Sequence, residues 1–483
     1  MDYSQFLAMK QEIGLLIVFL LVFLYDTFAS REGTRRVPVL STILFGLYTV
    51  ACFFPCVSQP GEMSAFAGMY VTSNPVAMIK NILNVGVLIV MIQSINWANT
   101  EEQAMRRGEF YELLMLTLFG MFLMISSRHF LVFVLGLETA SLPLAAMVAF
   151  DKYRYESHEA AVKYILTACF SSAIMLFGIS LVYGLAGSMY YSDVASAVRF
   201  EMASVPLIVA LAFVVSGVGF KLSLVPFHLW TADVYQGAPT NVTSYLSVIS
   251  KGSAAFAFLV ILSQAFGAVY AQVWEWMLYA LIILTITVGN LFAIRQTNLK
   301  RFLAFSSISQ AGYIMLGVIA DDSLGMAALM FYVLVYIFSN LAAFGVIGAI
   351  ENHCGKVDMR DYDGLYKTNP RLALSMMLAM FSLAGIPPFA GFFSKFFIFT
   401  GAISQGSIAI YVLVLIALIN TIVSLYYYLL VVKAMFINPS DNPIPTFRSA
   451  GTERLGLWIT VAGILLLGLV SPVYDSILTA AGL

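Results

Sequence analysis

The chain has 483 residues, of which 60% are hydrophobic and only 11% are charged. Soluble chains usually carry about 25% charged residues, so this composition excludes a soluble domain and indicates a polytopic membrane protein. The net charge of −1 gives no indication of a nucleic-acid partner.

Fourteen apolar runs follow one another along the chain, and each is long enough to cross about 30 Å of hydrocarbon as an α-helix. The runs are continuous rather than alternating, which excludes a closed β-barrel. The N-terminus lacks the positive start and cleavage site of a signal peptide, so we expect the first run to remain as a span. The expected spans are 12–29, 37–56, 74–95, 110–127, 129–150, 158–186, 204–230, 240–266, 270–294, 302–320, 323–350, 371–401, 405–434 and 455–480.

The lysines and arginines gather in the odd-numbered connections between these spans. Of the 25, 17 lie in or beside those connections, three lie on the opposite side (Lys10, Arg128 and Arg199) and five lie inside spans. Positive charge stays cytoplasmic, so we expect both termini to face the periplasm of a bacterial inner membrane. The 17 are Arg31, Arg35, Arg36, Arg106, Arg107, Lys152, Arg154, Arg295, Lys300, Arg301, Lys356, Arg360, Lys367, Arg371, Lys433, Arg448 and Arg454.

No motif for a redox cofactor or a nucleotide is visible. The four cysteines, Cys52, Cys56, Cys169 and Cys354, form no C-x-x-C pair, and an iron–sulfur cluster needs about four clustered thiolates. No G-x-G-x-x-G or Walker sequence is present. We therefore expect this chain to bind no NAD, flavin, ATP or metal.

The five basic residues inside the expected spans are all lysines: Lys80, Lys163, Lys221, Lys251 and Lys395. A buried lysine can release its proton whereas arginine cannot, and each charge costs about 2.5–3.5 kcal/mol at a helix centre. We expect Lys80 to snorkel to the outer interface. Lys163 could snorkel or serve the interior. The other three lie deep and predict protonatable sites lined by water.

Glu138, in LGLETASLPL, is the carboxylate that lies clearly deep in a span. A lone ionised carboxylate would be unstable there, so we expect Glu138 to be either protonated or paired. A nearby lysine would stabilise its charged form, and the carboxylate would in turn stabilise the ammonium. We predict a coupled pair in which movement of one partner changes the proton affinity of the other.

Prolines interrupt two long runs: Pro226 in KLSLVPFHLW, and Pro387 with Pro388 in SLAGIPPFAGFFSKFFIF. A proline removes a backbone hydrogen bond and kinks the helix; in lipid, the freed carbonyl needs a partner in a hydrated interior. Both runs also contain a lysine, and they are five spans apart, so they cross the membrane in opposite directions. This predicts inverted five-helix repeats with sites at the broken helices. The expected units are 1–109 (helices 1–3), 110–266 (helices 4–8), 267–434 (helices 9–13) and 435–483 (helix 14).

Other polar residues lie near these breaks. His228 follows Lys221 by seven residues and could pass a proton or cap the helix after the break. Lys300 and Arg301 lie at the cytoplasmic border, where we expect topology and interface charges. The polar positions of the next span, which could join helices or hold water, are Ser306, Ser307, Ser309 and Gln310.

Residues 220–259, FKLSLVPFHLWTADVYQGAPTNVTSYLSVISKGSAAFAFL, resemble the proton-translocating antiporter-like subunits of respiratory complex I. LGLETASLPL, RQTNLKRFLAFSSISQAGY and SLAGIPPFAGFFSKFFIF are similar as well, so the resemblance covers nearly the whole chain. WTADVYQGAP and Lys251 resemble the subunit N branch of this family, because the larger sister subunits differ after PFH.

The resemblance implies an all-α fold and proton translocation in the membrane arm, driven by quinone reduction in neighbouring subunits. FMN, iron–sulfur clusters and quinone would belong to those subunits. The partners would be other membrane-arm subunits, including sister antiporter-like subunits, and the lipid bilayer. The implied roles are Glu138 coupled to Lys221 in the first half-channel, Lys163 assisting, Lys251 as central relay, Lys395 in the other half-channel and His228 lining the hydrated path.

The chain departs from the family pattern at Gln310, where many relatives have histidine. Glutamine cannot titrate, so either water held by Gln310 replaces the imidazole or the step needs no titrating group.

Two other functions are compatible with this fold. One is a subunit of a multisubunit cation/proton antiporter or of a membrane-bound hydrogenase-type complex; the other is an assembly and anchor subunit without transport. WTADVYQGAP favours the quinone-reducing complex over the antiporter. The deep lysines argue against a scaffold, which would not keep unpaired buried charges.

Overall fold

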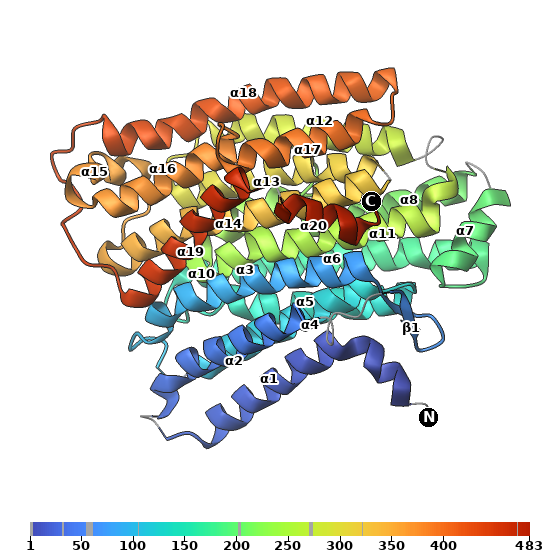
Figure 1. Cartoon of the computed structure of the whole chain (residues 1–483), viewed down its shortest axis with the longest axis horizontal. Helices are drawn as coiled ribbons and strands as arrows, with labels where there is room; N and C mark the ends of the chain where they lie inside the picture. The colour runs from blue at the N-terminus through green and yellow to red at the C-terminus, as the bar shows by residue number, and fades with distance from the viewer. Residues whose placement is uncertain are drawn as a thin grey trace.

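Long helices, most of them aligned in one direction, make up almost the whole molecule (Figure 1). The computed structural model describes residues 3–30, 33–54, 61–104, 106–200, 204–269, 274–320, 322–470 and 472–483. Arg31 and Cys56 lie outside the described residues. The expectation of an all-α membrane fold is confirmed, with one short antiparallel hairpin, β1 (Met63–Ala65) and β2 (Tyr70–Thr72), added between helices.

Three helices form the N-terminal part; the first two lie at the lower edge of Figure 1 and the third lies nearer its middle. Apolar side chains fill each of them, and Pro38 and Pro75 occupy the first turns of the second and third, where a missing N–H costs no hydrogen bond. The elements are η1 (Tyr3–Met9), α1 (Lys10–Phe28), η2 (Gly33–Arg36), α2 (Val37–Cys52) and α3 (Asn74–Ala98).

The first half of the remaining chain contains a broken helix at the predicted place. The run 204–230 forms α8, which ends at Leu222, and α9, which begins at Leu229. Ser223 caps α8 in the left-handed region at φ 61°, and Pro226 lies in the break. The elements are α4 (Arg107–Ser126), α5 (Phe130–Val148), α6 (Tyr155–Ala186), α7 (Tyr191–Phe200), α8 (Val205–Leu222), α9 (Leu229–Gly237), α10 (Thr240–Tyr245), the π-helical turn η3 (Leu246–Ser250), α11 (Lys251–Phe266) and η4 (Gly267–Val269).

The second half repeats that interruption. The run 371–401 forms α16 and α17, separated by residues 385–389 with Pro387 and Pro388 between them. The elements are α12 (Glu275–Ala293), α13 (Leu299–Ile319), α14 (Ser323–Cys354), η6 (Met359–Tyr362), α15 (Leu365–Thr368), α16 (Pro370–Ala384), α17 (Ala390–Ile403), α18 (Ile408–Phe436), α19 (Gly451–Leu469) and α20 (Pro472–Ala481).

Among the described residues, 12 helical segments are long and apolar enough to cross a membrane. The shorter α2 and the α16–α17 pair account for the two other predicted runs, so the count of fourteen spans remains a prediction. The inverted repeats also remain a prediction. The two halves nevertheless each contain one broken helix, and α6 in the first half has the same length as α14 in the second, 32 residues.

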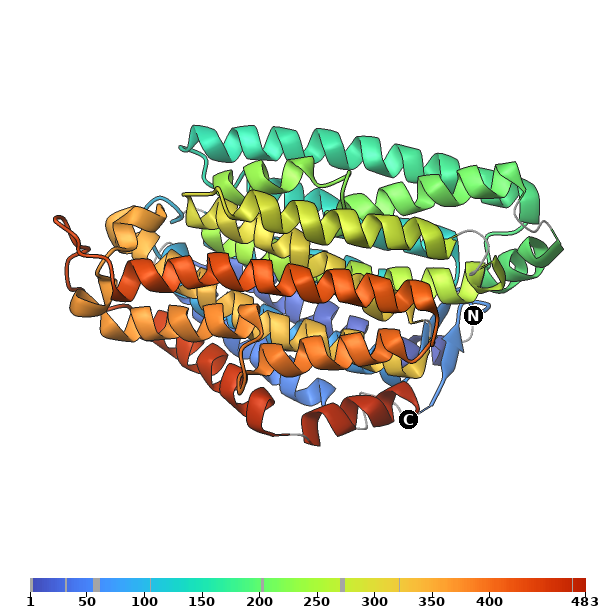
Figure 2. The same cartoon turned by 90° about the horizontal axis from the view of Figure 1, so that it is seen from above.

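Burial separates central helices from peripheral ones. In the most apolar 18-residue stretch of α13 every residue is buried, whereas only 33% of the residues are buried in the corresponding stretches of α1, α6 and α18. Figure 2 shows α6 along one outer edge and α19 with α20 along the other. Polar side chains on α11, α13 and α14 are therefore removed from lipid, which is where a hydrated interior is tolerated.

The two termini lie toward the same end of the helices, together with α7 and the hairpin (Figures 1 and 2). This agrees with an even number of crossings. Which membrane face that end meets remains the prediction made from the positive charges.

Candidate functional site

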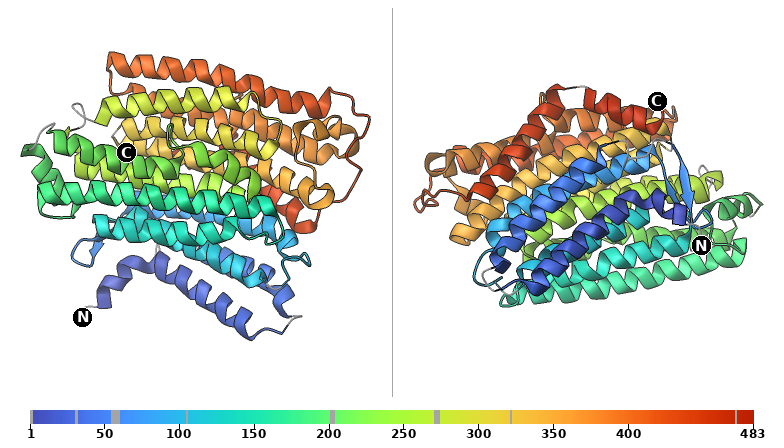
Figure 3. Two further views of the ribbon diagram at one scale, coloured as in Figure 1. Left: turned by 180° about the vertical axis from the view of Figure 1, so that it is seen from behind. Right: turned by 60° about the horizontal axis from the view of Figure 1, so that its bottom comes forward.

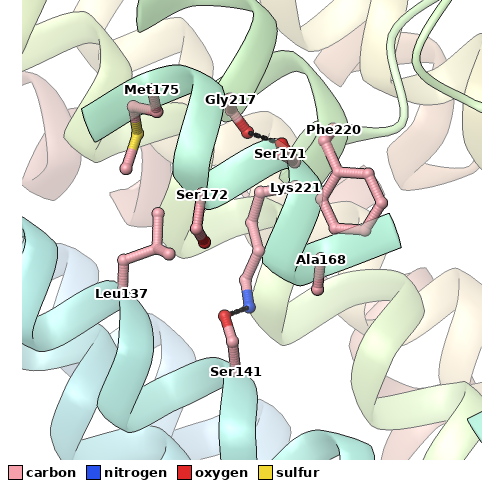
Figure 4. A pocket seen from close by; sticks show the side chains of 9 residues that line it. All are labelled: Leu137, Ser141, Ala168, Ser171, Ser172, Met175, Gly217, Phe220 and Lys221. Carbon is pink, nitrogen blue, oxygen red and sulfur yellow. Dashed lines mark hydrogen bonds between the residues drawn. The ribbon is translucent and has the colours of Figure 1, made fainter. Parts of the chain in front are cut away.

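Lys221 occupies the last turn of α8, immediately before the break. Its side chain is buried, and its Nζ donates a hydrogen bond of 2.8 Å to the hydroxyl oxygen of Ser141 on α5. The two residues line a cavity of about 10 Å³, close to the minimum that holds one water molecule (Figure 4). The C-terminal end of a helix carries partial negative charge, which stabilises an ammonium at this place.

Glu138 lies one turn before Ser141 on α5 and is half-buried. It lies within electrostatic reach of Lys221, yet in the described part of the chain no salt bridge joins the two residues, and its Oε1 has no hydrogen-bond partner. The coupled pair predicted from the sequence is therefore a pair at longer range, with Ser141 as the direct partner of the lysine.

Lys163 on α6 points to a different partner. Its Nζ lies 2.7 Å from Asp233 on α9 and 2.8 Å from Glu159, and 42% of its side chain is exposed. Asp233 also binds Arg301 of α13, at 2.6 Å. Lys163 thus belongs to a partly exposed ion network that ties α6, α9 and α13 together, and the structure does not bring it to Lys221.

Lys251 is the first residue of α11 and follows the π-helical turn η3, a feature that often marks functional sites. Its side chain is 1% exposed, and its Nζ donates a 2.8 Å hydrogen bond to the Ser307 hydroxyl of α13. The Tyr235 ring lies 5.6 Å from this nitrogen. The lysine thereby joins the first half of the chain to the second.

His228 precedes α9 as its N-cap residue, but its side chain makes no capping hydrogen bond. Its buried Nδ1 has no hydrogen-bond partner in the described part of the chain, whereas the ring interacts with the backbone of Pro226 in the break and lies within electrostatic reach of Lys251. The structure thus shows no side-chain cap on α9, and the choice between passing a proton and hydrogen bonding at the break remains a prediction.

Lys395 lies on α17 and reaches back to the end of α16. Its Nζ donates hydrogen bonds of 3.0 Å to the carbonyl oxygens of both Leu383 and Ala384, and the Tyr313 ring lies 5.3 Å away. These carbonyls lie at the C-terminal end of α16, which favours a cation. Gly385 makes the approach possible, because a Cβ there would lie 3.0 Å from Cδ of Lys395 at a φ of +85°.

Gln310 is held by tyrosines. Its Nε2 donates to the Tyr428 hydroxyl at 3.1 Å, and its Oε1 accepts a short hydrogen bond from Tyr332. A cavity of about 10 Å³, lined by Gln310, Tyr332 and Lys395 among others, lies next to it. The expectation that Gln310 holds a water remains a prediction, and this cavity is close to the minimum size that holds one.

Buried tyrosines also lie between the deep lysines. Tyr164 lies within electrostatic reach of both Glu138 and Tyr235, and the hydroxyls of Tyr164 and Tyr235 have no hydrogen-bond partner among the described residues. Tyr336 is placed similarly between Ser307 and Tyr332. A line of buried polar groups thus runs from Glu138 past Lys251 to Lys395.

Lys80 does not snorkel: it is 0% exposed and lies 2.6 Å from Glu12 of α1, a buried carboxylate that was not predicted from the sequence. Lys300 is buried as well: it is 2% exposed, donates to the Ala238 carbonyl at 2.8 Å and lies 3.6 Å from Glu351, while its place at the cytoplasmic border remains a prediction. The surroundings of both lysines depend on which helices pack together, and this packing cannot be predicted from the apolar runs of the sequence.

Ser307 was expected to join helices or hold water, but not as the partner of Lys251; not predicted at all were Ser141, the partner of Lys221, and the buried tyrosines. Two of these tyrosines could have been predicted from the sequence. Tyr332 and Tyr336 are four residues apart in an apolar run and so share one helix face. No group of three or more metal-ligating residues occurs in the described ranges.

The sequence matches the family model described as NADH:quinone oxidoreductase/Mrp antiporter, TM, over residues 127–421, more than half of the chain. It is 52% identical to NADH-quinone oxidoreductase subunit N of Phocaeicola vulgatus over 98% of both chains. It is 50% identical to the protein of that name from Azobacteroides pseudotrichonymphae, over 99% of this chain and 98% of the relative.

Solved structures show the same fold. A chain of respiratory complex I from Thermus thermophilus is 30% identical with a TM-score of 0.78, over 96% of this chain and 97% of that one. A chain of the Mrp complex from Dietzia sp. has a TM-score of 0.84 at 22% identity, over 100% of this chain and 97% of that one. The latter likeness concerns the fold alone.

Proposed function

We propose that this chain, which belongs to the NADH:quinone oxidoreductase and Mrp antiporter family of membrane subunits, is a proton-translocating subunit of the membrane arm of an NADH–quinone oxidoreductase. One observation carries the proposal: the three deep lysines, Lys221, Lys251 and Lys395, are held by neutral oxygens of hydroxyl or carbonyl groups. A lysine with a carboxylate partner stays charged, whereas one held by a neutral acceptor in a buried site can release its proton.

Three other lysines provide the contrast. Lys80, Lys163 and Lys300 each have a carboxylate within 3.6 Å. Their surroundings favour a permanent charge on the lysine, and we infer that Lys163 assists the first half-channel through its contact with Asp233 while Lys300 stabilises the packing. These three lysines therefore differ from the deep ones in the charge of the partner.

Protons would move along the line of polar groups already described. Glu138 and Lys221 form the coupled pair of the first half-channel, Lys251 is the central relay, with His228 beside it, and Lys395 serves the second half-channel. Tyrosine hydroxyls and small cavities between these groups can hold the intervening waters. Motion of either broken helix would change the distance from an ammonium to its acceptor and so its hold on the proton.

The remainder of the reaction is assigned to partner subunits. NADH oxidation, with its FMN and iron–sulfur clusters, and quinone reduction would take place there, and this chain would supply no redox centre. We assign it to the bacterial inner membrane with both termini periplasmic, beside sister antiporter-like subunits. The units 1–109, 110–266, 267–434 and 435–483 would be the N-terminal helices, the two inverted repeats and the last helix.

The test replaces Lys221 in the assembled complex. We expect Lys221→Ala to lower proton pumping and coupled electron transfer roughly 10²-fold, since loss of one positioned acid–base group typically costs about that much, while the complex still assembles. Lys221→Arg should not restore turnover, because its guanidinium keeps its proton. Pumping is measured as acidification by inverted membrane vesicles supplied with NADH.

Lys356→Ala is the matched control, since this lysine lies after α14 and contacts Asp361 at 3.8 Å. Full turnover with arginine at position 221 would refute the protonation role. A cation/proton antiporter would instead show loss of sodium tolerance on deletion of the subunit, and normal pumping by an assembled Lys251→Ala complex would indicate a subunit with no transport of its own.

A further inference from the structure

A second cluster of buried charged and polar groups lies in the N-terminal helices, outside both expected repeats. Glu12 of α1 and Lys80 of α3 form an ion pair with 1% and 0% side-chain exposure, and Lys80 also donates to the Tyr70 hydroxyl of β2 at 3.1 Å. A buried ion pair adds little net stability compared with apolar residues of the same volume. Stability alone therefore does not account for it.

Three polar atoms around this pair have no partner in the described part of the chain. They are Oε2 of Glu12 and both amide atoms of Asn84, which is 0% exposed and lies one helical turn after Lys80. The Tyr48 side chain is close to both Glu12 and Asn84. Buried polar atoms without protein partners usually bind water, so this arrangement has the acceptors and donors that one ordered water needs.

The cluster is covered at one end by the hairpin. Ala65 and Tyr70 of the hairpin pack with Ala8, and the Phe66 amide donates to Oε1 of Gln5 at 2.8 Å. Figure 3 shows the N-terminal segment and the hairpin together at one end of α1. Tyr70 of this hairpin also contacts Lys80, so the hairpin forms part of the cover over the pair.

We propose that Glu12 and Lys80 form a second proton-binding site, in which a water held by Asn84 delivers a proton to the free oxygen of Glu12. The donor is a hydronium ion arriving through that water: one of its O–H bonds breaks, a new O–H bond forms at Oε2, and a neutral water remains. The site changes from ammonium with carboxylate, net charge zero, to ammonium with carboxylic acid, net charge +1. The other titratable or charged groups facing it are Tyr48 and Cys52 of α2, Tyr70 of β2 and Arg128 before α5.

The site rests on the proposed function, because it is a further proton-exchanging step of the same subunit. Its test is Asn84→Leu, which leaves the ion pair intact. A purely structural pair predicts unchanged or improved stability and unchanged pumping, since an unpaired buried amide is removed. A proton-binding site predicts fewer protons pumped per NADH, because the water loses its partner. Gln11→Leu is the matched control: it removes the 2.9 Å contact of Gln11 with Asn81 between the same two helices and should pump normally.

Infrared difference spectra of the complex on acidification give a second readout that does not depend on pumping. The wild type should show a protonated-carboxyl band that is absent in the double variant Glu12→Gln/Lys80→Met, whose neutral pair avoids leaving a lone buried charge. The proposal would be overturned if the band persisted in the Glu12→Gln/Lys80→Met variant and the Asn84→Leu variant pumped normally. Normal pumping by Lys221→Ala would refute the proposed function instead, and the band would still decide whether Glu12 takes up a proton.

Discussion

The Lys251 ammonium donates a 2.8 Å hydrogen bond to the Ser307 hydroxyl. This contact joins α11 to α13 and directly links the two halves of the polar line. A hydrogen bond to a charged group contributes about 1.5–3 kcal/mol. We therefore expect Ser307→Ala to lower the rate of coupled proton pumping roughly tenfold, since about 1.4 kcal/mol corresponds to a factor of ten.

The control for this prediction is Ser253→Ala, two residues after Lys251. Its buried hydroxyl donates to the Ser250 carbonyl of its own helix at 2.9 Å and does not contact the lysine. Equal losses in the two variants would show that the removal of any buried hydroxyl at this place slows the complex, and the assignment of Ser307 would then fail. The measurement is NADH-driven acidification of inverted vesicles, normalised to assembled complex.

Gly385 offers a second test, through the backbone. Gly385→Ala places a methyl group 3.0 Å from Cδ of Lys395 and in the left-handed region, at φ +85°. The conformation alone costs about 1–2 kcal/mol. We expect less assembled complex and, in the complex that does assemble, a several-fold loss of pumping as the ammonium is pushed away from the α16 carbonyls.

Gly406→Ala separates the two effects. Gly406 has a similar φ of +73°, but nothing lies within 4 Å of its Cβ position. It should therefore reproduce the loss of stability without the loss of pumping per assembled complex. If both variants pump normally once assembled, contact between residue 385 and Lys395 is not needed for turnover.

The broken helices and the deep lysines could be predicted from the sequence because hydrophobicity and proline act locally. Lys221, Lys251 and Lys395 stood out as charges in apolar runs, and Pro226 marked its break. Their partners could not be predicted. Ser141 is 80 residues from Lys221, and Ser307 is 56 residues from Lys251, so each contact depends on which helices pack together.

The error at Lys80 has the same origin. Its position near the start of α3 suggested snorkelling, which is correct for a lysine that faces lipid. Glu12, 68 residues earlier, was read as part of the beginning of the first span, and only the packing of α1 against α3 brings the two within 2.6 Å. The pattern of residues within one helix cannot predict an ion pair between two helices.

Gln310 gives a pH-dependent prediction. Gln310→His can keep one ring nitrogen as acceptor for Tyr332 and the other as donor to Tyr428, the two contacts that the glutamine makes now. We expect near-normal pumping at alkaline pH. When the imidazole takes up a proton in acid, both nitrogens become donors, Tyr332 loses its acceptor and a charge is added beside Lys395. Turnover should then fall with falling pH more steeply than in the wild type.

Gln310→Leu completes this comparison. It removes the acceptor of the Tyr332 hydroxyl at all pH values, at a cost of about 1–3 kcal/mol for the unpaired buried group. Its loss should not depend on pH in the range where imidazole titrates. A histidine variant whose pH profile coincides with that of the wild type would mean that residue 310 carries no charge during turnover.

The last prediction concerns Asp151, in the connection between α5 and α6. Burial raises the pKa of this carboxyl above its usual range, although Arg154 and Lys300 oppose the shift. The folded state therefore holds the proton more tightly than the unfolded state, and stability falls as the pH rises from the unfolded pKa through the folded one. Asp151→Asn removes this penalty.

The same substitution can add a contact. Gln103 already donates to Oδ1 of Asp151 at 2.8 Å, while Oε1 of Gln103 has no partner in the described ranges. An asparagine amide could donate to it, for about 1 kcal/mol. We expect a higher midpoint of thermal unfolding at pH 7 and a smaller gain in acid, where the wild-type carboxyl is neutral.

Glu101→Gln, which removes an exposed charge nearby, should leave the midpoint unchanged at both pH values. A gain of equal size at both pH values would point to the added hydrogen bond alone, and a lower midpoint at pH 7 would show that attraction to Arg154 and Lys300 outweighs the cost of burial.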